Sequence, residues 1–504
     1  MQPVPLPGTL RHITWRGTLR SCNYHCGYCP FSRKKEDAGA LFQDASAMEQ
    51  LLCVLETRPF IHPVSVLLAP HGEGLIHPHY RHGLSRLSRC AQVARVSCQT
   101  NLSMDAKQLL DDFSIHHADF SRVSLWATFH PSMADLNGFL EKIHLLSRHF
   151  PLSVGAVADP ENLSVLRQLK DGLPGNTHFW LNAMDGRKRP YTDLEEQECS
   201  ALDPFWNLER GRFSAQFSHC SGGRQSIFVQ ADGTIHPCNR SPIRLGNLYE
   251  TDLKQMKTPG PGTCRGRCDC FLAYSFRKDL PQLFSLGPWP QMRLGRSSES
   301  EKIQALFLDV DGTLTGPDGY IRPTVVSGSA RISGHYAIYL VTALPVEWAL
   351  KKCRAIWPHL AGGVFAYGAD IRDFRLNRTA QHPLPVVMKD AAHSYGAENS
   401  CIYKQVLRET PRTVPPGCRI IVEEGVVSLC AAHVDKVAGV QTICAWNGWN
   451  PEKVAVMGNS AADVAMLTAF PFSLAPPDAE REAADAARFH MTAEDLFLLC
   501  SESG

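Results

Sequence analysis

Short apolar runs alternate with amphipathic stretches along the first two hundred residues. Between the runs, apolar residues recur at helical spacing, as in "ADLNGFLEKIHLLSRHF" (134–150). Strand, helix, strand at this spacing predicts a parallel sheet or barrel, with functional residues in the loops at the strand carboxyl ends. The runs that we interpret as strands are Val64–Pro70, Arg95–Asn101, Arg122–Pro131, Leu152–Pro160 and Thr177–Met184.

The pattern changes twice further along the chain. Residues 201–284 are turn-rich and contain several cysteines. Residues 285–302, "SLGPWPQMRLGRSSESEK", concentrate Gly, Pro and Ser without periodicity, which is typical of a linker. "IQALFLDVDGTLT" then begins a second α/β pattern, so we predict domains at 1–200, 201–284 and 303–504.

Composition narrows the function classes. The chain has 504 residues, with Lys+Arg 51 against Asp+Glu 50 and a net charge of +1. This balance argues against a broad nucleic-acid or anionic membrane surface. The opening segment has no apolar core of the length that a signal peptide needs, so we expect a cytoplasmic protein without a membrane partner. Among 18 cysteines, eight fall into two groups, which favours metal ligation over disulfides.

The first group is Cys22, Cys26 and Cys29, in "SCNYHCGYCPFSRKK". Three thiolates can hold three corners of a [4Fe–4S] cluster and leave the fourth iron open for a substrate or cofactor. Spacing alone also allows a zinc knuckle, with His25 or a residue elsewhere as a further ligand.

A Cys-x3-Cys-x2-Cys loop after a first strand, with an aromatic residue before the last cysteine, resembles the radical S-adenosylmethionine superfamily. "APHGEG" carries the Gly-Glu of that family's Gly-Gly-Glu motif, with His71 in place of the first glycine, and "CQTNLS" resembles its Thr-Asn element. The resemblance implies a partial (β/α)6 TIM-like barrel, a [4Fe–4S] cluster, S-adenosylmethionine and an electron donor such as flavodoxin or ferredoxin. It implies cofactor contacts at Tyr28, Gly72, Glu73, Thr100, Asn101, Ser124 and Thr128. The reaction it implies is hydrogen abstraction by a 5′-deoxyadenosyl radical.

The second cysteine group lies around a predicted hairpin and resembles the SPASM/twitch extensions of some radical enzymes. That resemblance implies an auxiliary [4Fe–4S] cluster, and a structural zinc is the alternative on spacing. We favour Cys220, Cys238, Cys268 and Cys270 as its ligands, with Cys264 as a substitute.

The second α/β pattern carries paired carboxylates, Asp309 and Asp311, after a buried strand. One such carboxylate can attack a phosphoryl group while the other protonates the leaving oxygen. "IYLVTALP", "HVDKVAGVQTI" and "VMGNSAADVAML" follow in order, and the set resembles the haloacid dehalogenase-like (HAD) phosphatases.

The HAD resemblance implies Asp309 as nucleophile, Asp311 as acid/base, Thr342 as a phosphoryl contact and Lys436 as a charge partner. It implies Mg²⁺ held by Asp309, the carbonyl of Asp311, Asn459 and Asp463. Asn459 stands where the family usually has Asp; an amide oxygen ligates without charge, so we predict weaker Mg²⁺ binding. The cap, at about residues 346–432, resembles that of the Cof-type sugar-phosphatase branch.

The leading hypothesis is therefore a bifunctional enzyme: radical chemistry on a phosphorylated small molecule, coupled to phosphate removal. Basic residues near the predicted barrel mouth agree with it, at 33–35 and 187–189, although they can equally be solvated surface charge. One alternative is a peptide-modifying radical enzyme with a separate phosphatase step. Another is a non-catalytic Fe–S scaffold.

Overall fold

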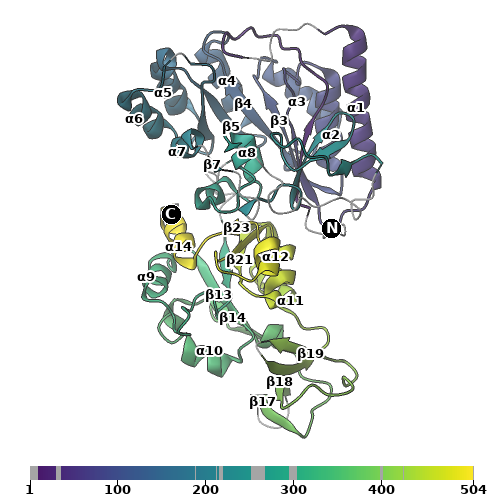
Figure 1. Cartoon of the computed structure of the whole chain (residues 1–504), viewed down its shortest axis with the longest axis vertical. Coiled ribbons are helices and arrows are strands. Elements are labelled where there is room, and N and C mark those ends of the chain that lie inside the picture. The colour runs from purple at the N-terminus through teal and green to yellow at the C-terminus, as the bar shows by residue number, and fades with distance from the viewer. Residues whose placement is uncertain are drawn as a thin grey trace. The chain divides into compact units, whose positions relative to one another are not determined.

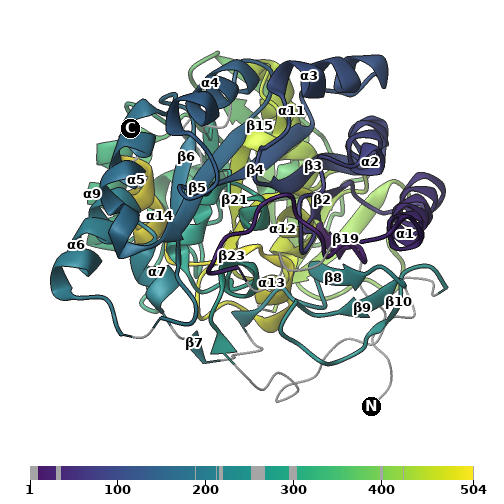
Figure 2. The ribbon, with the colours of Figure 1, turned by 90° about the horizontal axis from the view of Figure 1, so that it is seen from above.

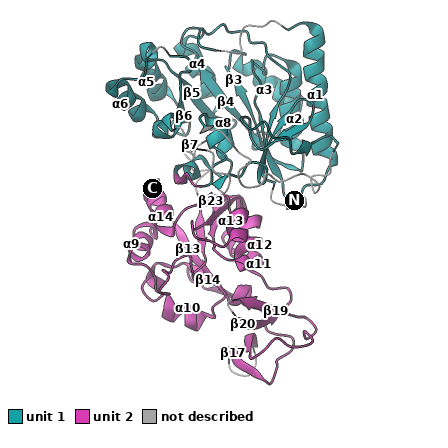
Figure 3. Cartoon of the chain, viewed as in Figure 1, with its two compact units in different colours: residues 1–278, 282–301 teal, residues 279–281, 302–504 magenta. Residues whose placement is uncertain are grey.

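The computed structural model forms two compact units (Figures 1 and 3). Unit 1 comprises residues 1–278 and 282–301, and unit 2 comprises residues 279–281 and 302–504. The structure describes residues 10–29, 36–187, 189–211, 213–214, 219–250, 267–294, 303–397, 401–423 and 425–502.

Unit 1 is built on a nine-stranded sheet in the order β10-β9-β8-β1-β2-β3-β4-β5-β6. Strands β1 to β6 and β8 are parallel, and β9 and β10 extend the edge as antiparallel strands. The parallel strands are apolar along most of their length, as expected where both faces are buried. Their bounds are β1 His12–Arg16, β2 Val64–Leu68, β3 Val93–Thr100, β4 Val123–Phe129, β5 Leu152–Ala158, β6 His178–Ala183, β8 Ser226–Gln230, β9 Thr234–His236 and β10 Gly246–Asn247.

A helix follows each of the first six strands, and Figure 2 shows these helices along the outer side of the sheet. Aspartates cap three of them, because a carboxylate accepts hydrogen bonds from the otherwise free amide groups of the first turn. The helices are α1 Ala38–Thr57, α2 Pro78–Arg89, α3 Ala106–Ile115, α4 Leu136–Leu146, α5 Leu163–Gly172, α6 Asp193–Leu202 and α7 Trp206–Arg210. The predicted alternation of strand and helix and the parallel pairing are confirmed; closure as a TIM-like barrel of the radical type stays a prediction.

The end of unit 1 corrects one expectation. After β7 (Phe213–Ser214), β11 (Arg267–Cys268) and α8 (Phe271–Tyr274), residues 285–294 pack into unit 1 instead of forming a linker. Met292 and Arg293 are almost completely buried, and Trp289 is 7% exposed. This stretch is rich in Gly, Pro and Ser, but a few of its other side chains are buried in unit 1.

Unit 2 has an eight-stranded sheet in the order β16-β15-β14-β13-β12-β21-β22-β23, with helices α9 to α14 packed around it. Strands β12, β13, β14, β21, β22 and β23 are parallel, and β15 and β16 form an antiparallel edge. Its strands are β12 Ala305–Leu308, β13 Ala337–Val341, β14 Gly362–Phe365, β15 Asp370–Asp373, β16 Arg378–Gln381, β21 Val454–Met457, β22 Phe472–Ala475 and β23 Phe489–His490. Its helices are α9 Pro323–Ile332, α10 Val346–Lys352, α11 Lys436–Asn447, α12 Val464–Ala469, α13 Arg481–Ala486 and α14 Ala493–Glu502.

A smaller antiparallel sheet in the order β17-β18-β20-β19 lies between β16 and α11 in the chain. Its strands are β17 Ala391–Ala397, β18 Cys401–Leu407, β19 Cys418–Glu423 and β20 Val426–Ala431. Residues 346–381, which the sequence led us to assign to the cap, lie instead in α10 and in strands of the larger sheet, because β14 pairs with β13. In the described part of the chain, no helix combines the length and the apolar character of a membrane span.

Candidate functional site

A cavity of about 1160 Å³ opens in unit 1 at the carboxyl ends of β1 to β6. Loops that follow parallel strands meet at this edge, which is where such folds bind ligands. The volume lies just above the usual range for a small-molecule site. Its lining includes Arg16, Cys22, Cys26, Tyr28, Cys29, Gly72, Glu73, Thr100, Asn101, Thr128, Arg187 and Cys270.

The three cysteines of the first loop all line this cavity. Carboxylates hold the loop in place: Asp44 accepts from the amide of Leu19 (2.9 Å), and Glu36 accepts from the amide of Arg20 (2.6 Å). Burial raises the pKa of the Cys26 thiol to about 11, with a smaller contribution from the neighbouring Cys29 and Cys22 and against a hydrogen bond with Tyr28. The thiols are therefore within electrostatic range of one another.

The donor set fits a cluster that lacks a fourth protein ligand. Three thiols from one loop face one cavity, while His25, the alternative zinc ligand, is exposed and does not line it. Across the described residues, however, no three His, Cys, Asp or Glu side chains lie close enough together to hold a metal ion. Binding a cluster would therefore require the loop to draw its sulfur atoms together.

Glu73 is the most buried acid of the cavity, 1% exposed. Its carboxylate accepts from the Thr100 hydroxyl (2.8 Å), the Asn101 amide (2.5 Å) and the Leu75 amide (2.9 Å). Burial raises its pKa to about 7, although the three donors oppose that shift. The Asn101 side-chain amide lies 3.5 Å from the Cys22 sulfur, so the structure brings these predicted residues together.

Of the other predicted cofactor contacts, Tyr28 and Thr128 line the cavity and Ser124 does not. Tyr28 lines the cavity, where its hydroxyl is 2.7 Å from the imidazole Nδ1 of His130, and Thr128 lines it as well. Ser124 does not, because its hydroxyl faces β3 and donates to the carbonyl of Val96 (3.2 Å). His71, at the departure from the family motif, lines the cavity with its pKa lowered to about 4 by burial and by nearby arginines.

The second cysteine group reaches the same cavity through Cys270. The side-chain amide of Asn239 lies 3.6 Å from the Cys270 sulfur, and Cys268 lies beside it in β11. Cys220 lies near Pro237, the residue before Cys238, because both are close to Gly222. A Cβ atom added to Gly222 would lie 2.8 Å from the carbonyl oxygen of Pro237 and 3.2 Å from the Cys220 sulfur. Four thiols on this extension suffice in number for a fully ligated cluster or a zinc ion, but no three of these four, all within the described part of the chain, lie close enough together to hold a metal in this structure. Cys264 lies outside the described residues.

In unit 2, a buried ion cluster lies where β12 and β21 end. Lys436, at the start of α11, donates to Asp309 (2.8 Å) and to Asp463 (2.6 Å). Burial pushes the pKa of Asp309 well above its usual value against the attraction of Lys436, and the two carboxylates raise the pKa of Lys436. Paired carboxylates beside a buried cation suit the attack of one anion on another.

Three more predicted residues lie on the loops that follow β12, β13 and β21. The side-chain oxygen of Asn459 accepts from the hydroxyl of Thr313 (3.2 Å), and the backbone amide of Asn459 donates to the carboxylate of Asp463 (3.0 Å). The hydroxyl of Thr342, after β13, accepts from the amide of Leu344 (3.1 Å). Asp311 instead pairs with Lys352 of α10. The two buried carboxylates with the amide oxygen of Asn459 fit a hard cation such as Mg²⁺.

The smaller sheet reaches this region through Glu423. Its carboxylate accepts from the hydroxyls of Tyr367 (2.5 Å) and Ser460 (3.3 Å), and Ser460 belongs to the loop that carries Asp463. Glu423 of the smaller sheet therefore contacts the loop that carries Asp463, beside the ion cluster. At this position it can affect which substrates reach the cluster.

Sequence reasoning missed several residues of both sites. Lys352 and Glu423 have no local motif, because each meets its partner only through the fold. His130 follows β4 within a stretch already considered for cofactor contact, and its position after a strand end was an available signal. Arg293, which does not line the cavity itself but hydrogen-bonds to Asn182 in its wall, lay in the presumed linker.

Comparisons with family models identify two regions. Residues 397–495 match the model of haloacid dehalogenase-like hydrolases, and residues 220–259 match the SPASM model, an iron-sulfur cluster-binding domain. The chain thus carries a hydrolase domain and is an enzyme, and it carries an Fe–S extension that includes Cys220 and Cys238. No curated protein matches the chain.

Solved structures resemble the C-terminal part. A phosphatase of the haloalkanoate (HAD) enzyme superfamily from Bacteroides thetaiotaomicron is 14% identical, covering 41% of this chain and 97% of its own, with a TM-score of 0.35. A haloacid dehalogenase-like hydrolase from the same organism is 12% identical, covering 40% and 99%, with a TM-score of 0.34. A Thermoplasma acidophilum protein is 17% identical, covering 40% and 98%, with a TM-score of 0.34.

Proposed function

We propose that unit 1 is a radical S-adenosylmethionine enzyme and unit 2 a Mg²⁺-dependent phosphohydrolase acting in the same pathway. The observation that carries the radical proposal is the meeting of Cys22, Glu73, Thr100 and Asn101 in one cavity, from a loop and two strand ends that are distant in sequence. When bound, the cluster would supply the electron that cleaves S-adenosylmethionine into methionine and a 5′-deoxyadenosyl radical.

The chain's own residues would bind and orient the cofactor. Oε1 of Glu73 already accepts from Leu75 and Thr100, whereas Oε2 accepts from the backbone of Asn101 and keeps room for another donor, such as the amino group of a methionyl moiety. The amide of Asn101 would fix the Cys22 sulfur, and Tyr28 with His130 would close the cavity above the loop. The enclosed space would exclude water from a reactive intermediate.

The test is anaerobic reconstitution with iron and sulfide, reduction, and measurement of 5′-deoxyadenosine from S-adenosylmethionine. We expect product from the wild type and from Cys53→Ala, which removes an exposed cysteine outside the cavity. The triple Cys22, Cys26 and Cys29→Ala variant should form none. Product formation by the triple variant, or its absence from reconstituted wild type, would refute the radical proposal.

The auxiliary site is tested by metal content. Two [4Fe–4S] clusters give about eight irons per chain, whereas zinc in the second site leaves about four. Cys270→Ala should lower the count by about four irons while the first cluster remains, because Cys270 is one of the four thiols that we favour as ligands of the auxiliary cluster.

For unit 2, the proposed reaction is attack by Asp309 on a phosphate ester, with Asp311 as proton donor and acceptor. Lys436 would offset the charge of the two buried carboxylates as an anionic substrate approaches. Asp311 would have to exchange its contact with Lys352 for the leaving oxygen.

Asn459→Asp tests the metal site. The substitution adds a charge beside Asp463, so we expect the Mg²⁺ concentration for half-maximal hydrolysis of p-nitrophenyl phosphate to fall about tenfold. Asp463→Asn, which removes a charge from the same site, is the matched opposite. An unchanged or raised Mg²⁺ requirement in Asn459→Asp would contradict this assignment of the ligands.

The substrate proposed for the pair is a phosphorylated small molecule. Metabolite profiling with each half inactivated in turn tests the coupling, and consumption of no phosphorylated metabolite would end it. Two other candidates give different results. A peptide-modifying enzyme would bind a precursor peptide, and a non-catalytic Fe–S scaffold would yield no 5′-deoxyadenosine.

A further inference from the structure

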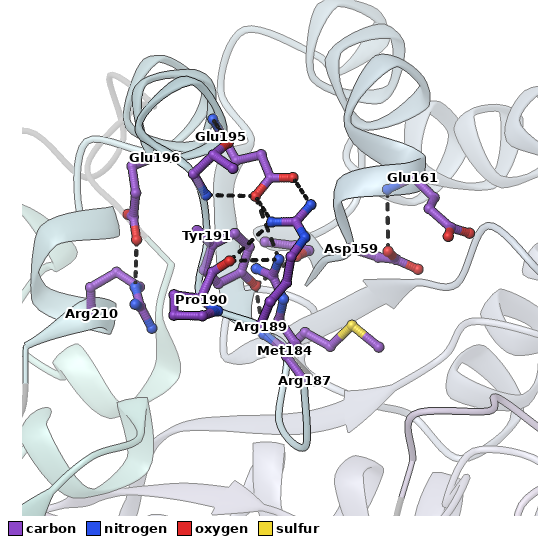
Figure 4. A network of polar contacts seen from close by, with 12 residues as sticks. Asp159, Glu161, Met184, Arg187, Arg189, Pro190, Tyr191, Glu195, Glu196 and Arg210 are labelled. Carbon is purple, nitrogen blue, oxygen red and sulfur yellow. Dashed lines mark hydrogen bonds and ion pairs between the residues drawn. The ribbon is translucent and has the colours of Figure 1, made fainter.

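In the loop after β6, residues 184–187 and 189–191 line the unit 1 cavity. Figure 4 shows the polar contacts around Arg187 in this loop. The guanidinium of Arg187 lies over the ring of Tyr191, with its Cζ atom 3.5 Å from the ring centre. The Cζ atom of Arg210 lies 5.0 Å from the same ring centre. Two cations are thus gathered on one aromatic ring at the cavity wall.

Tyr191 is a fixed support for them. Its hydroxyl donates to the carbonyl of Ala158 (2.7 Å) and accepts from the amide of Met184 (2.9 Å). The edge of Trp206 packs against the ring at 5.1 Å, and Tyr191 is 8% exposed. A cation stacked on such a ring is held in place before any ligand arrives, which lowers the entropy cost of binding.

The charges near this ring are unequally satisfied. Glu195 accepts two short hydrogen bonds from Arg189 (2.9 and 2.6 Å), and Glu196 accepts from Arg210 (2.9 Å). Arg187 reaches Glu195 and the carbonyl of Pro190 only at 3.5 Å, in both cases through Nη2. Glu195 therefore gives its shorter hydrogen bonds to Arg189 and pairs with Arg187 only at 3.5 Å.

The second terminal nitrogen of Arg187, Nη1, is buried and has no hydrogen-bond acceptor among the described residues. The side chain is 11% exposed and lines the cavity, so most of it is shielded from bulk water while a small molecule in the cavity can still reach it. Four acids line the cavity. Glu73 accepts from its own neighbours, Glu209 from Tyr274 and Ala183, and Asp269 from Arg240, while Asp185 is exposed. A buried, charged donor without an acceptor costs free energy in the empty site and recovers it when an anion binds.

We propose that Arg187 is the anchor of an oxyanion subsite, which takes a phosphate or carboxylate group of a molecule bound in the cavity with the cysteine loop. Guanidinium groups pair with such oxyanions through paired N–H donors. Tyr191 supplies the support, and Arg210 adds positive charge at the rim. That this molecule is the substrate of the radical half rests on the proposed function; the subsite itself does not.

Chemical protection of Arg187 in the wild-type full chain tests the subsite. Phenylglyoxal modifies accessible arginines, and peptide mass spectrometry locates each adduct, so phosphate bound at the unit 2 site does not affect the readout. The matched control is Arg167 on α5, which is 56% exposed and does not line the cavity. Inorganic phosphate and S-adenosylmethionine are added in separate arms, without reductant.

We expect phosphate at about ten times its dissociation constant to slow modification of Arg187 about tenfold and to leave Arg167 unchanged. Protection by S-adenosylmethionine in place of phosphate would support the subsite and identify the cofactor carboxylate as its occupant. Equal rates in all arms, equal protection of Arg167, or no adduct at Arg187 in the unliganded protein would each overturn the proposal. The protection arms contain no electron donor, so they do not depend on radical chemistry. If Arg187 is protected, and unmodified protein forms no 5′-deoxyadenosine in the separate assay with reductant, only the radical function is refuted.

Discussion

At the scale of single residues, Gly72 shows how closely the cysteine loop and the Gly-Glu turn approach each other. A Cβ at this position would lie 1.7 Å from the carbonyl oxygen of Ser21, a backbone atom that cannot move aside freely. Gly27, in the cysteine loop, has open space around the same position. The glycine is therefore required by packing, with no need of a special backbone angle.

We predict that Gly72→Ala lowers the free energy of unfolding by about 2–4 kcal/mol, because the backbone must shift. Gly27→Ala should change it by less than about 0.5 kcal/mol. Urea titration of both variants measures the difference. Similar stability for the two variants would mean that the turn and the loop are not in contact in solution.

His178, at the start of β6, links residue chemistry to pH. Burial and the nearby Arg293 lower its pKa to about 3, from about 6.5 in the unfolded chain. The folded state resists protonation, so this contribution to stability is present above pH 6.5 and is lost as pH falls towards 3.

At pH 5 the loss amounts to about 2 kcal/mol relative to pH 7.5. His178→Phe should remove that part of the pH dependence, whereas His149→Gln, which replaces an exposed ring, should not. Unfolding by urea at the two pH values checks this. A wild-type pH dependence in His178→Phe would place the acid sensitivity elsewhere.

Much of the candidate chemistry at this scale was predictable, because motifs record which residues follow a strand end. Glu73, Thr100, Lys436 and Asp463 lie where their motifs suggest. Ser124 does not reach the cavity, because it lies near the amino end of β4, on the same face as Thr128 but far from the carboxyl end where the cavity opens; the motif match does not tell how deep in the sheet a residue lies. Lys352 could not be found, because its contact with Asp311 depends on the packing of α10.

At the scale of elements, the segment that ends unit 1 is the main departure from expectation. Arg293 donates to the side-chain oxygen of Asn182 (2.7 Å) and the carbonyl of Leu181 (3.2 Å). Its guanidinium lies 4.3 Å from the ring centre of Trp180 and 4.1 Å from that of Phe271. The composition suggested a linker because the segment is rich in Gly and Pro. Composition does not reveal that one arginine of the segment hydrogen-bonds to β6.

Arg293→Ala should therefore destabilise unit 1 by about 3 kcal/mol, since it removes both hydrogen bonds and the stacked cation. Arg148→Ala, at an exposed position after α4, is the control and should be nearly neutral. The urea midpoint of unit 1 reports both. A midpoint equal to that of the control would mean that this segment is not anchored in solution.

At the scale of the whole molecule, the two units each have a core of their own. The unit 2 core is formed by residues between Ala305 and Ala487, and its ion cluster draws only on that unit. The alternation of strands and helices predicted both α/β units. The sequence-based prediction placed the start of the cap too early in the chain, because it assigned β14 to β16 to the insertion. In the structure these strands pair within the larger sheet.

We predict that residues 302–504 expressed alone fold and hydrolyse p-nitrophenyl phosphate at a rate within about twofold of the full chain. The same fragment with Asp309→Asn should be inactive, which excludes a contaminating phosphatase. An insoluble fragment, or one that is folded and inactive, would show that catalysis in unit 2 needs the first unit.

The anchored segment before unit 2 also bears on how such a fusion could arise or be undone in evolution. A stop codon near position 285 would remove Met292 and Arg293, both buried in the first unit. Two separately encoded halves would therefore have to divide after Leu294, so that the upstream gene keeps the piece that completes its own interior.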